Sequence, residues 1–142
     1  MARPPGTELP DIPDLSLTLP ARAENVAVVR HAIGGLGEAL DVDDQTLSDV
    51  KLAVTEACTN TVVHAYPEGE GPLEVIAYLH DARLMIVVRD EGLGIVPRTD
   101  SPGLGLGLPL IATLAESLEL GTDEGRRTEV RMTFRLGEQA AV

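Results

Sequence analysis

Apolar positions recur every three or four residues in three stretches of the chain, the spacing typical of amphipathic helices. They predict one helix at Ala23–Leu40, a second from about Gln45 to Ala65 and a third at Leu108–Leu118. Acidic residues at Asp41–Asp44 are suited to capping the start of the second helix. Three glycines in the second half of the first helix weaken the prediction there.

Other stretches alternate apolar and polar positions, as half-buried strands do. A short strand is predicted at Leu15–Leu19 and a longer one at Thr128–Leu136. Leu73–Leu79 and Leu84–Arg89 are joined by a short polar link and indicate an antiparallel hairpin. Glu119–Leu120 is a candidate start for a further strand.

The chain of 142 residues suits a single domain. Residues 1–14 are rich in proline and are expected to form a flexible arm, with the domain at 15–136 and a short tail at 137–142. Asp90–Gly107 is too rich in glycine and proline for a helix or strand. A loop of this length in a compact domain is usually functional or disordered.

Charge and composition exclude several classes of partner. A formal net charge of −12 argues against direct binding of nucleic acid or acidic membranes, which requires Lys and Arg to meet phosphates. The single cysteine, Cys58, excludes an internal disulfide and a Cys-rich zinc site, and is expected to be a small core residue. Neither a membrane-spanning run nor a secretory signal is recognisable, so we expect a cytoplasmic protein.

The second predicted helix carries a polar row that is suited to chemistry. Glu56, Asn60 and His64 are spaced four apart and share one helix face. An amide oxygen is a suitable ligand for Mg²⁺, which binds few protein groups when phosphates supply the rest. A glutamate one turn away is able to orient or deprotonate a hydroxyl. Taken alone, the row is better explained as a solvated polar stripe opposite the core, and it indicates chemistry only together with a phosphate-binding element elsewhere in the chain.

Two glycine-containing segments lie further along the chain. Asp90-Glu-Gly-Leu-Gly94 follows an apolar strand, where a carboxylate can accept a hydrogen bond from an exocyclic amine such as that of adenine. Gly103-Leu-Gly-Leu-Gly107 directly precedes a helix, where backbone N–H groups attract anions. A plain turn and a flexible connector are the alternatives. Neither segment is a Rossmann motif or a P-loop, and the only lysine, Lys51, lies in a helix.

These motifs, in this order and followed by Arg127-Thr128-Glu-Val-Arg-Met132, resemble the GHKL ATPase superfamily, which has the Bergerat fold. The likeness runs from about Leu15 to Leu136 and is greatest to the single-domain anti-sigma factors with serine-protein kinase activity. It implies an α+β two-layer sandwich, in which a mixed, mostly antiparallel sheet has its helices packed on one face.

The resemblance also implies a role for each matching residue. Glu56 corresponds to the general base, Asn60 to the Mg²⁺ ligand and Asp90 to the carboxylate that reads adenine. Gly92 and Gly94 correspond to glycines that shape the adenine pocket. The phosphate-binding lid is matched by Gly103, Gly105 and Gly107, and a threonine near the adenine by Thr128. His64 is expected to be structural. The family's usual glycine is replaced by Arg127, and the lid offers no lysine, only Arg98.

By the same resemblance, the protein binds ATP and Mg²⁺, sequesters a sigma factor and phosphorylates a serine or threonine of an anti-anti-sigma antagonist, as a homodimer. The alternative is a non-catalytic module of the same fold that works through nucleotide or protein contacts alone. We do not expect the catalytic half of a sensor histidine kinase or a gyrase-type ATPase, because each needs a further helical or transducer domain.

Overall fold

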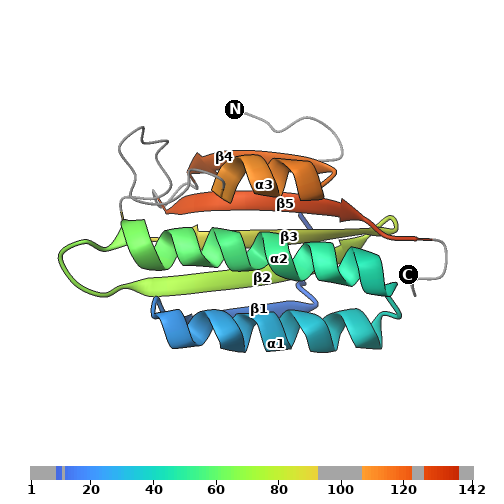
Figure 1. Cartoon of the computed structure of the whole chain (residues 1–142), viewed down its shortest axis with the longest axis horizontal. Helices are drawn as coiled ribbons and strands as arrows, with labels where there is room; N and C mark the ends of the chain where they lie inside the picture. Colours follow the sequence, from blue (N-terminus) through green and yellow to red (C-terminus); the bar gives the residue numbers. More distant parts are fainter. Residues whose placement is uncertain (1–8, 11, 93–106, 123–126, 138–142) are drawn as a thin grey trace.

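A five-stranded sheet forms one layer of the molecule (Figure 1). The computed structural model describes residues 9–10, 12–92, 107–122 and 127–137. The strands lie in the order β1-β2-β3-β5-β4, and all four pairings are antiparallel. Their bounds are β1 Leu15–Pro20, β2 Pro72–His80, β3 Arg83–Asp90, β4 Ser117–Thr122 and β5 Thr128–Arg135. The predicted hairpin is β2–β3.

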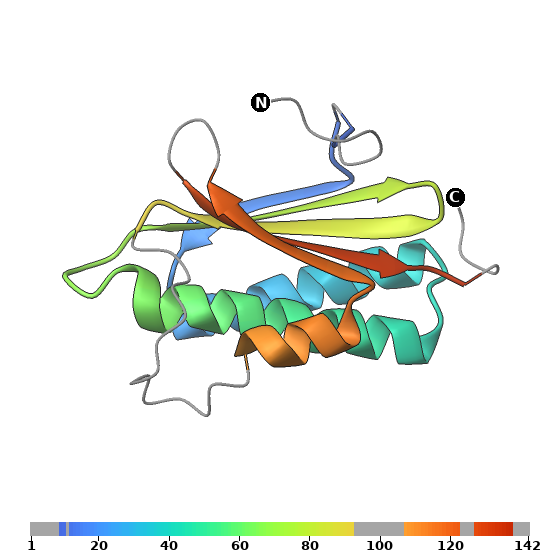
Figure 2. The ribbon, with the colours of Figure 1, turned by 90° about the horizontal axis from the view of Figure 1, so that it is seen from above.

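The helices form the second layer and cover one face of the sheet (Figure 2). They are α1 (Ala23–Ala39), α2 (Asp44–Asn60) and α3 (Gly107–Leu114), with α2 between the other two (Figure 1). A π-helical turn, η1 (Thr61–Ala65), continues α2. This arrangement confirms the predicted two-layer fold with its helices on one face. Within the described residues, no helix is both long and apolar enough to cross a bilayer.

The core lies between the two layers and is almost entirely aliphatic. Side chains alternate between the faces of a strand, so every second residue of the sheet points toward the helices. The fully buried side chains on that side and on the helices include Val75, Ile86, Val88, Met132, Val29, Ile33, Val50 and Val54. A smaller cluster on the opposite face joins Ile76, Tyr78, Met85 and Val87, with Leu9 packed against it.

Two details of the helices differ from the predictions. The third helix ends at Leu114 rather than Leu118, because the chain there pairs with β5: Glu116 N–H donates to the Thr133 carbonyl at 2.8 Å, and Leu118 lies opposite Met132. The glycines do not interrupt α1, which runs to Ala39. Gly37 instead allows close helix contact, since a Cβ there would lie 2.3 Å from Leu47 Cδ1.

Candidate functional site

The last turn of α2 carries the two residues predicted to do chemistry. Glu56 and Asn60 are half-buried and one turn apart, while Ala57 and Cys58 between them are in the core. Core packing therefore fixes which way the two polar side chains point. The change to i→i+5 bonding at Thr61 shifts His64 around the helix axis, so it does not continue their row in α-helical register.

The glycine that begins α3 lies directly against the Asn60 side chain. A Cβ on Gly107 would be 2.7 Å from Asn60 Nδ2 and 3.2 Å from Oδ1, closer than side-chain carbons normally approach. Only glycine fits there without displacing the amide. The end of the predicted phosphate-binding segment therefore reaches Asn60. Its other members, Gly103 and Gly105, lie outside the described residues, as do Gly94 and Arg98.

Asp90 and Thr128 are neighbours on adjacent strands, on the face of the sheet that the helices cover. Asp90 ends β3 and lies opposite Thr128 of β5. It continues the inward-facing row of Ile86 and Val88, and is only 3% exposed. Its Oδ1 accepts a hydrogen bond from Gly92 N–H at 3.0 Å. A buried carboxylate with an adjacent hydroxyl is thus directed toward the layer that contains α2.

The turn after β3 packs against the end of the helix. A Cβ on Gly92 would lie 2.0 Å from the Ala65 carbonyl oxygen, so the two backbones are in contact. Figure 2 shows the ends of η1 and β3 at the same end of the molecule, with α3 starting alongside α2. Three segments distant in sequence therefore meet here: the end of α2 with η1, the turn at Asp90–Gly92 and the start of α3. The start of β5 is joined to them through the pairing of Thr128 with Asp90.

Cys58 takes no part in this arrangement. Its side chain is fully buried, and burial raises the pKa of the thiol to about 12. A thiol of that kind is neither a nucleophile nor a metal ligand at neutral pH. The expectation that Cys58 is a core residue is confirmed.

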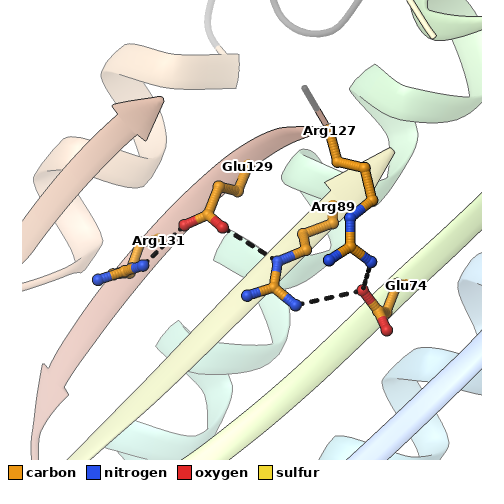
Figure 3. A network of polar contacts seen from close by, with 5 residues as sticks. All are labelled: Glu74, Arg89, Arg127, Glu129 and Arg131. Carbon is orange, nitrogen blue, oxygen red and sulfur yellow. Dashed lines mark hydrogen bonds and ion pairs between the residues drawn. The ribbon is translucent and has the colours of Figure 1, made fainter. Parts of the chain in front are cut away.

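A chain of ion pairs, which we call the charge ladder, lies on the opposite face of the sheet (Figure 3). Arg131 Nη2 lies 2.8 Å from Glu129, and Glu129 lies 3.0 Å from Arg89 Nε. Glu74 is shared by Arg89 Nη1 at 3.4 Å and Arg127 Nη1 at 3.3 Å. The ladder joins β2, β3 and β5, and includes the arginine that replaces the family's usual glycine.

Burial and charge act against each other on this ladder. Burial raises the pKa of Glu129, but hydrogen bonds from Arg131 and Arg89 outweigh it, so the pKa is below its ordinary value. For Arg89, burial lowers the pKa, while Glu129 and Glu74 raise it above its usual range. The sequence patterns did not reveal the charge ladder, because they do not show which strands pair. The strand register reveals it, since Arg89 lies directly opposite Glu74 on one side and Glu129 on the other.

Sequence reasoning also assigned no role to Tyr66, the residue that directly follows η1. The structure places its hydroxyl 2.7 Å from Glu91 N and 2.6 Å from the Pro72 carbonyl, beside the turn that carries Asp90. Among the described residues, no group of three or more His, Cys, Asp or Glu side chains is positioned to hold a metal ion.

Known proteins are similar to this chain over most of its length. Residues 19–134 match the model of the histidine kinase-like ATPase domain. The serine-protein kinase RsbW of Bacillus thuringiensis (strain Al Hakam) is 33% identical over 126 residues, which cover 78% of this chain and 79% of that protein. RsbW of Bacillus mycoides (strain KBAB4) is also 33% identical, over the same shares of both chains.

Two solved structures are similar in fold. The RsbU and RsbW domains of Rv1364c from Mycobacterium tuberculosis align with a TM-score of 0.70 and 23% identity, over 89% of this chain and 33% of that one. The SiaB–SiaC complex from Pseudomonas aeruginosa aligns with a TM-score of 0.60 and 16% identity, over 86% of this chain and 89% of that one. At these identities the likeness supports the fold alone.

The matches agree with the motifs from which the family was inferred. The family model covers the helix with Glu56 and Asn60, the turn at Asp90 and the strand with Thr128. The relatives' 33% identity over most of both chains confirms the predicted ATP use and serine-protein kinase activity. The chain therefore belongs to the histidine kinase-like ATPase domain family and, within it, to the anti-sigma serine-protein kinases.

Proposed function

We propose that this protein is a cytoplasmic switch that uses Mg-ATP to choose between two partners. It sequesters a sigma factor, and it phosphorylates a serine or threonine of an anti-anti-sigma protein, which ends the antagonist's ability to compete. As the family resemblance implies, it works as a homodimer. The acidic surface expected from a net charge of −12 favours a partner with basic groups over direct contact with DNA.

The observation that carries this proposal is the meeting of three segments at the end of α2. Asn60 is in contact range of the position where Gly107 would bear a Cβ, and the turn at Gly92 touches Ala65. Asp90 and Thr128 are paired on the same face of the sheet. This arrangement is compatible with a bound nucleotide whose base lies at the Asp90 carboxylate and whose phosphates lie at the Asn60 amide and the N-terminus of α3.

Each residue of the site is assigned one role. Asp90 accepts a hydrogen bond from the adenine amine, with Thr128 beside it. Gly92, which the resemblance assigns to the adenine pocket, lets the turn that carries Asp90 pack against Ala65. The backbone at Gly107 faces the phosphates. Glu56 is the general base. The corresponding roles of Gly94, Gly103 and Gly105 stay predictions, because these residues lie outside the described ones.

The side chains at the site fit Mg²⁺. Asn60 offers one hard, neutral amide oxygen, held at the start of α3 by its contact with Gly107. Mg²⁺ prefers oxygen ligands and usually keeps several waters, with substrate phosphates completing its shell, so one or two protein ligands are enough. When bound, it neutralises charge on the triphosphate.

The reaction that we propose is a direct phosphoryl transfer. The serine oxygen of the partner bonds to the γ-phosphorus, and the bond from that phosphorus to the β–γ bridging oxygen breaks. ADP leaves with the electron pair, and the hydroxyl proton passes to the Glu56 carboxylate. Asn60 and Glu56, one turn apart on a core-packed helix, keep the phosphate and the base in fixed relation.

The decisive experiment incubates the purified protein with γ-labelled Mg-ATP and candidate antagonist proteins. We expect label on a serine or threonine of an antagonist, and we expect the unmodified antagonist to release a sigma factor from the complex. Binding of nucleotide without transfer to any antagonist would favour the non-catalytic module instead. Absence of nucleotide binding at millimolar concentrations would overturn the proposal.

Substitution of Gly107 by alanine should separate folding from function. The new Cβ would lie 2.7 Å from Asn60 Nδ2, so the flexible amide must move while the backbone stays. A displacement of about 1 Å in a positioning group is able to lower phosphoryl transfer by about 100-fold. Transfer rate and Mg-ATP affinity are measured beside Gly121→Ala, a strand glycine whose added Cβ meets nothing within 4 Å. Equal activity of the two variants would contradict this placement of Asn60.

A further inference from the structure

Tyr66 links three segments of the chain through one hydroxyl group. It follows η1 directly, and its hydroxyl donates to the Pro72 carbonyl at 2.6 Å, at the start of β2. The same oxygen accepts a hydrogen bond from Glu91 N–H at 2.7 Å, just past the end of β3. The end of the α2 helix is thereby fastened to the strand ends that enter and leave the hairpin.

The ring of Tyr66 is held as closely as its hydroxyl. A Cβ on Gly71 would lie 2.2 Å from Tyr66 Cε1, and a Cβ on Gly92 would lie 2.9 Å from Tyr66 Cδ1. Two glycines from different segments therefore leave space for one aromatic ring. Because Gly92 also touches the Ala65 carbonyl, the turn after β3 rests on both Ala65 and Tyr66.

The two backbone amides that directly follow Asp90 are both hydrogen-bonded. Glu91 N–H is bound to the Tyr66 hydroxyl, and Gly92 N–H is bound to Asp90 Oδ1. The orientation of the Asp90 carboxylate therefore depends on where Tyr66 holds the turn. A neutral hydrogen bond of this kind has a modest effect on stability but fixes geometry.

We propose that Tyr66 is a positioning residue that sets the distance and angle between the adenine-reading Asp90 and the helix that carries Asn60 and Glu56. It acts through the turn and does not itself touch nucleotide. This inference rests on the proposed role of Asp90. It predicts that the hydroxyl controls how tightly, and how selectively, the base is held, while the rate of transfer from bound ATP is left unchanged.

The ionisation of Tyr66 is consistent with this role. Burial raises its pKa above the ordinary value, the Glu91 N–H bond lowers it, and the charges of Asp90 and Glu91 raise it further. The phenol is therefore protonated at neutral pH and retains the hydrogen that it donates to Pro72. The influence of Asp90 on this pKa also reflects its proximity.

The test compares Tyr66→Phe with Tyr78→Phe in the full chain. The sequence contains only these two tyrosines, so the two variants lose the same group. Tyr78 is buried in the cluster on the opposite face of the sheet, away from α2. Affinity for Mg-ATP and Mg-GTP, the KM and kcat of transfer, and the unfolding midpoint are measured for each protein.

For Tyr66→Phe we expect the Kd for Mg-ATP to rise about five- to tenfold, as for loss of one orienting hydrogen bond. Preference for ATP over GTP should fall, kcat at saturating ATP should be retained, and Tyr78→Phe should match the unmodified protein in all nucleotide measurements. Unchanged ATP affinity and selectivity in Tyr66→Phe, or equal losses in both variants, would overturn the inference. If the unmodified protein binds no ATP, the proposed function itself fails, and this inference with it.

Discussion

Substitution of Glu56 by glutamine should lower the rate of phosphoryl transfer by about 100- to 10,000-fold, the usual contribution of a general base. Glutamine keeps the size of the side chain and its place on α2, but it cannot take the proton of the attacking hydroxyl. Binding of Mg-ATP should be retained, because the proposed site holds the nucleotide through Asp90 and the residues around Asn60, and not through Glu56. Single-turnover transfer to an antagonist measures the first effect, and equilibrium titration with nucleotide measures the second.

The matched control for this variant is Glu38→Gln. Glu38 is exposed on α1, so the same chemical change is made on the neighbouring helix. It should transfer phosphate at the normal rate. If Glu56→Gln were as active as Glu38→Gln, the base would have to be another group, and the role assigned to Glu56 would be wrong.

Substitution of Glu129, the central carboxylate of the charge ladder, by alanine should lower the free energy of unfolding more than loss of any exposed ion pair. Glu129→Ala leaves Arg131 and Arg89, whose side chains are only 7% and 15% exposed, without the carboxylate that neutralises both. Breaking a buried pair by removing one partner costs about 3 kcal/mol or somewhat more. Urea unfolding followed by circular dichroism measures the change as a lower midpoint with an unchanged slope.

Glu70→Ala provides the comparison, because its pair with Arg22 is half exposed on both sides and such pairs contribute little to stability.

The dependence of stability on pH gives a second test of Glu129. Since the pKa of Glu129 is lower in the fold than its ordinary value, its stabilisation is complete above that ordinary value and is lost as the pH falls through the lowered one. Glu129→Ala should therefore lose less stability on acidification than the unmodified protein. Coincident acid curves would show that the ionised Glu129 carboxylate adds no stability.

The sequence predicted the elements well, since their packing is regular. Alternation and helical spacing located all of the strands and helices, apart from the start of β4 and the end of α3. That boundary was wrong because Leu118 fits the apolar row of a helix and equally the inward-facing side of a strand. Pairing with Met132 on β5 decides between the two, and pairing over that distance is invisible to local patterns.

The site was accessible from sequence only as separate short motifs. Residue type and the family resemblance identified Asn60, Asp90 and Thr128, but not which atoms lie side by side. The contact between Gly107 and Asn60 depends on how α3 packs along α2, and the bond from Tyr66 to Glu91 depends on the π-helical turn. Neither the turn nor the packing has a periodic signal in the sequence.

Strands β3 and β5 each place a site residue and a charged residue at adjacent positions on opposite faces. Asp90 follows Arg89, and Glu129 follows Thr128. Deletion of one residue inside either strand would exchange the faces. It would turn a guanidinium or carboxylate into the aliphatic core and turn Asp90 or Thr128 away from the proposed site. The lengths of these two strands therefore have little tolerance for change. The link at Asp81–Ala82 is constrained as well, because both residues have positive φ and the length of a tight hairpin turn sets the register of its two strands.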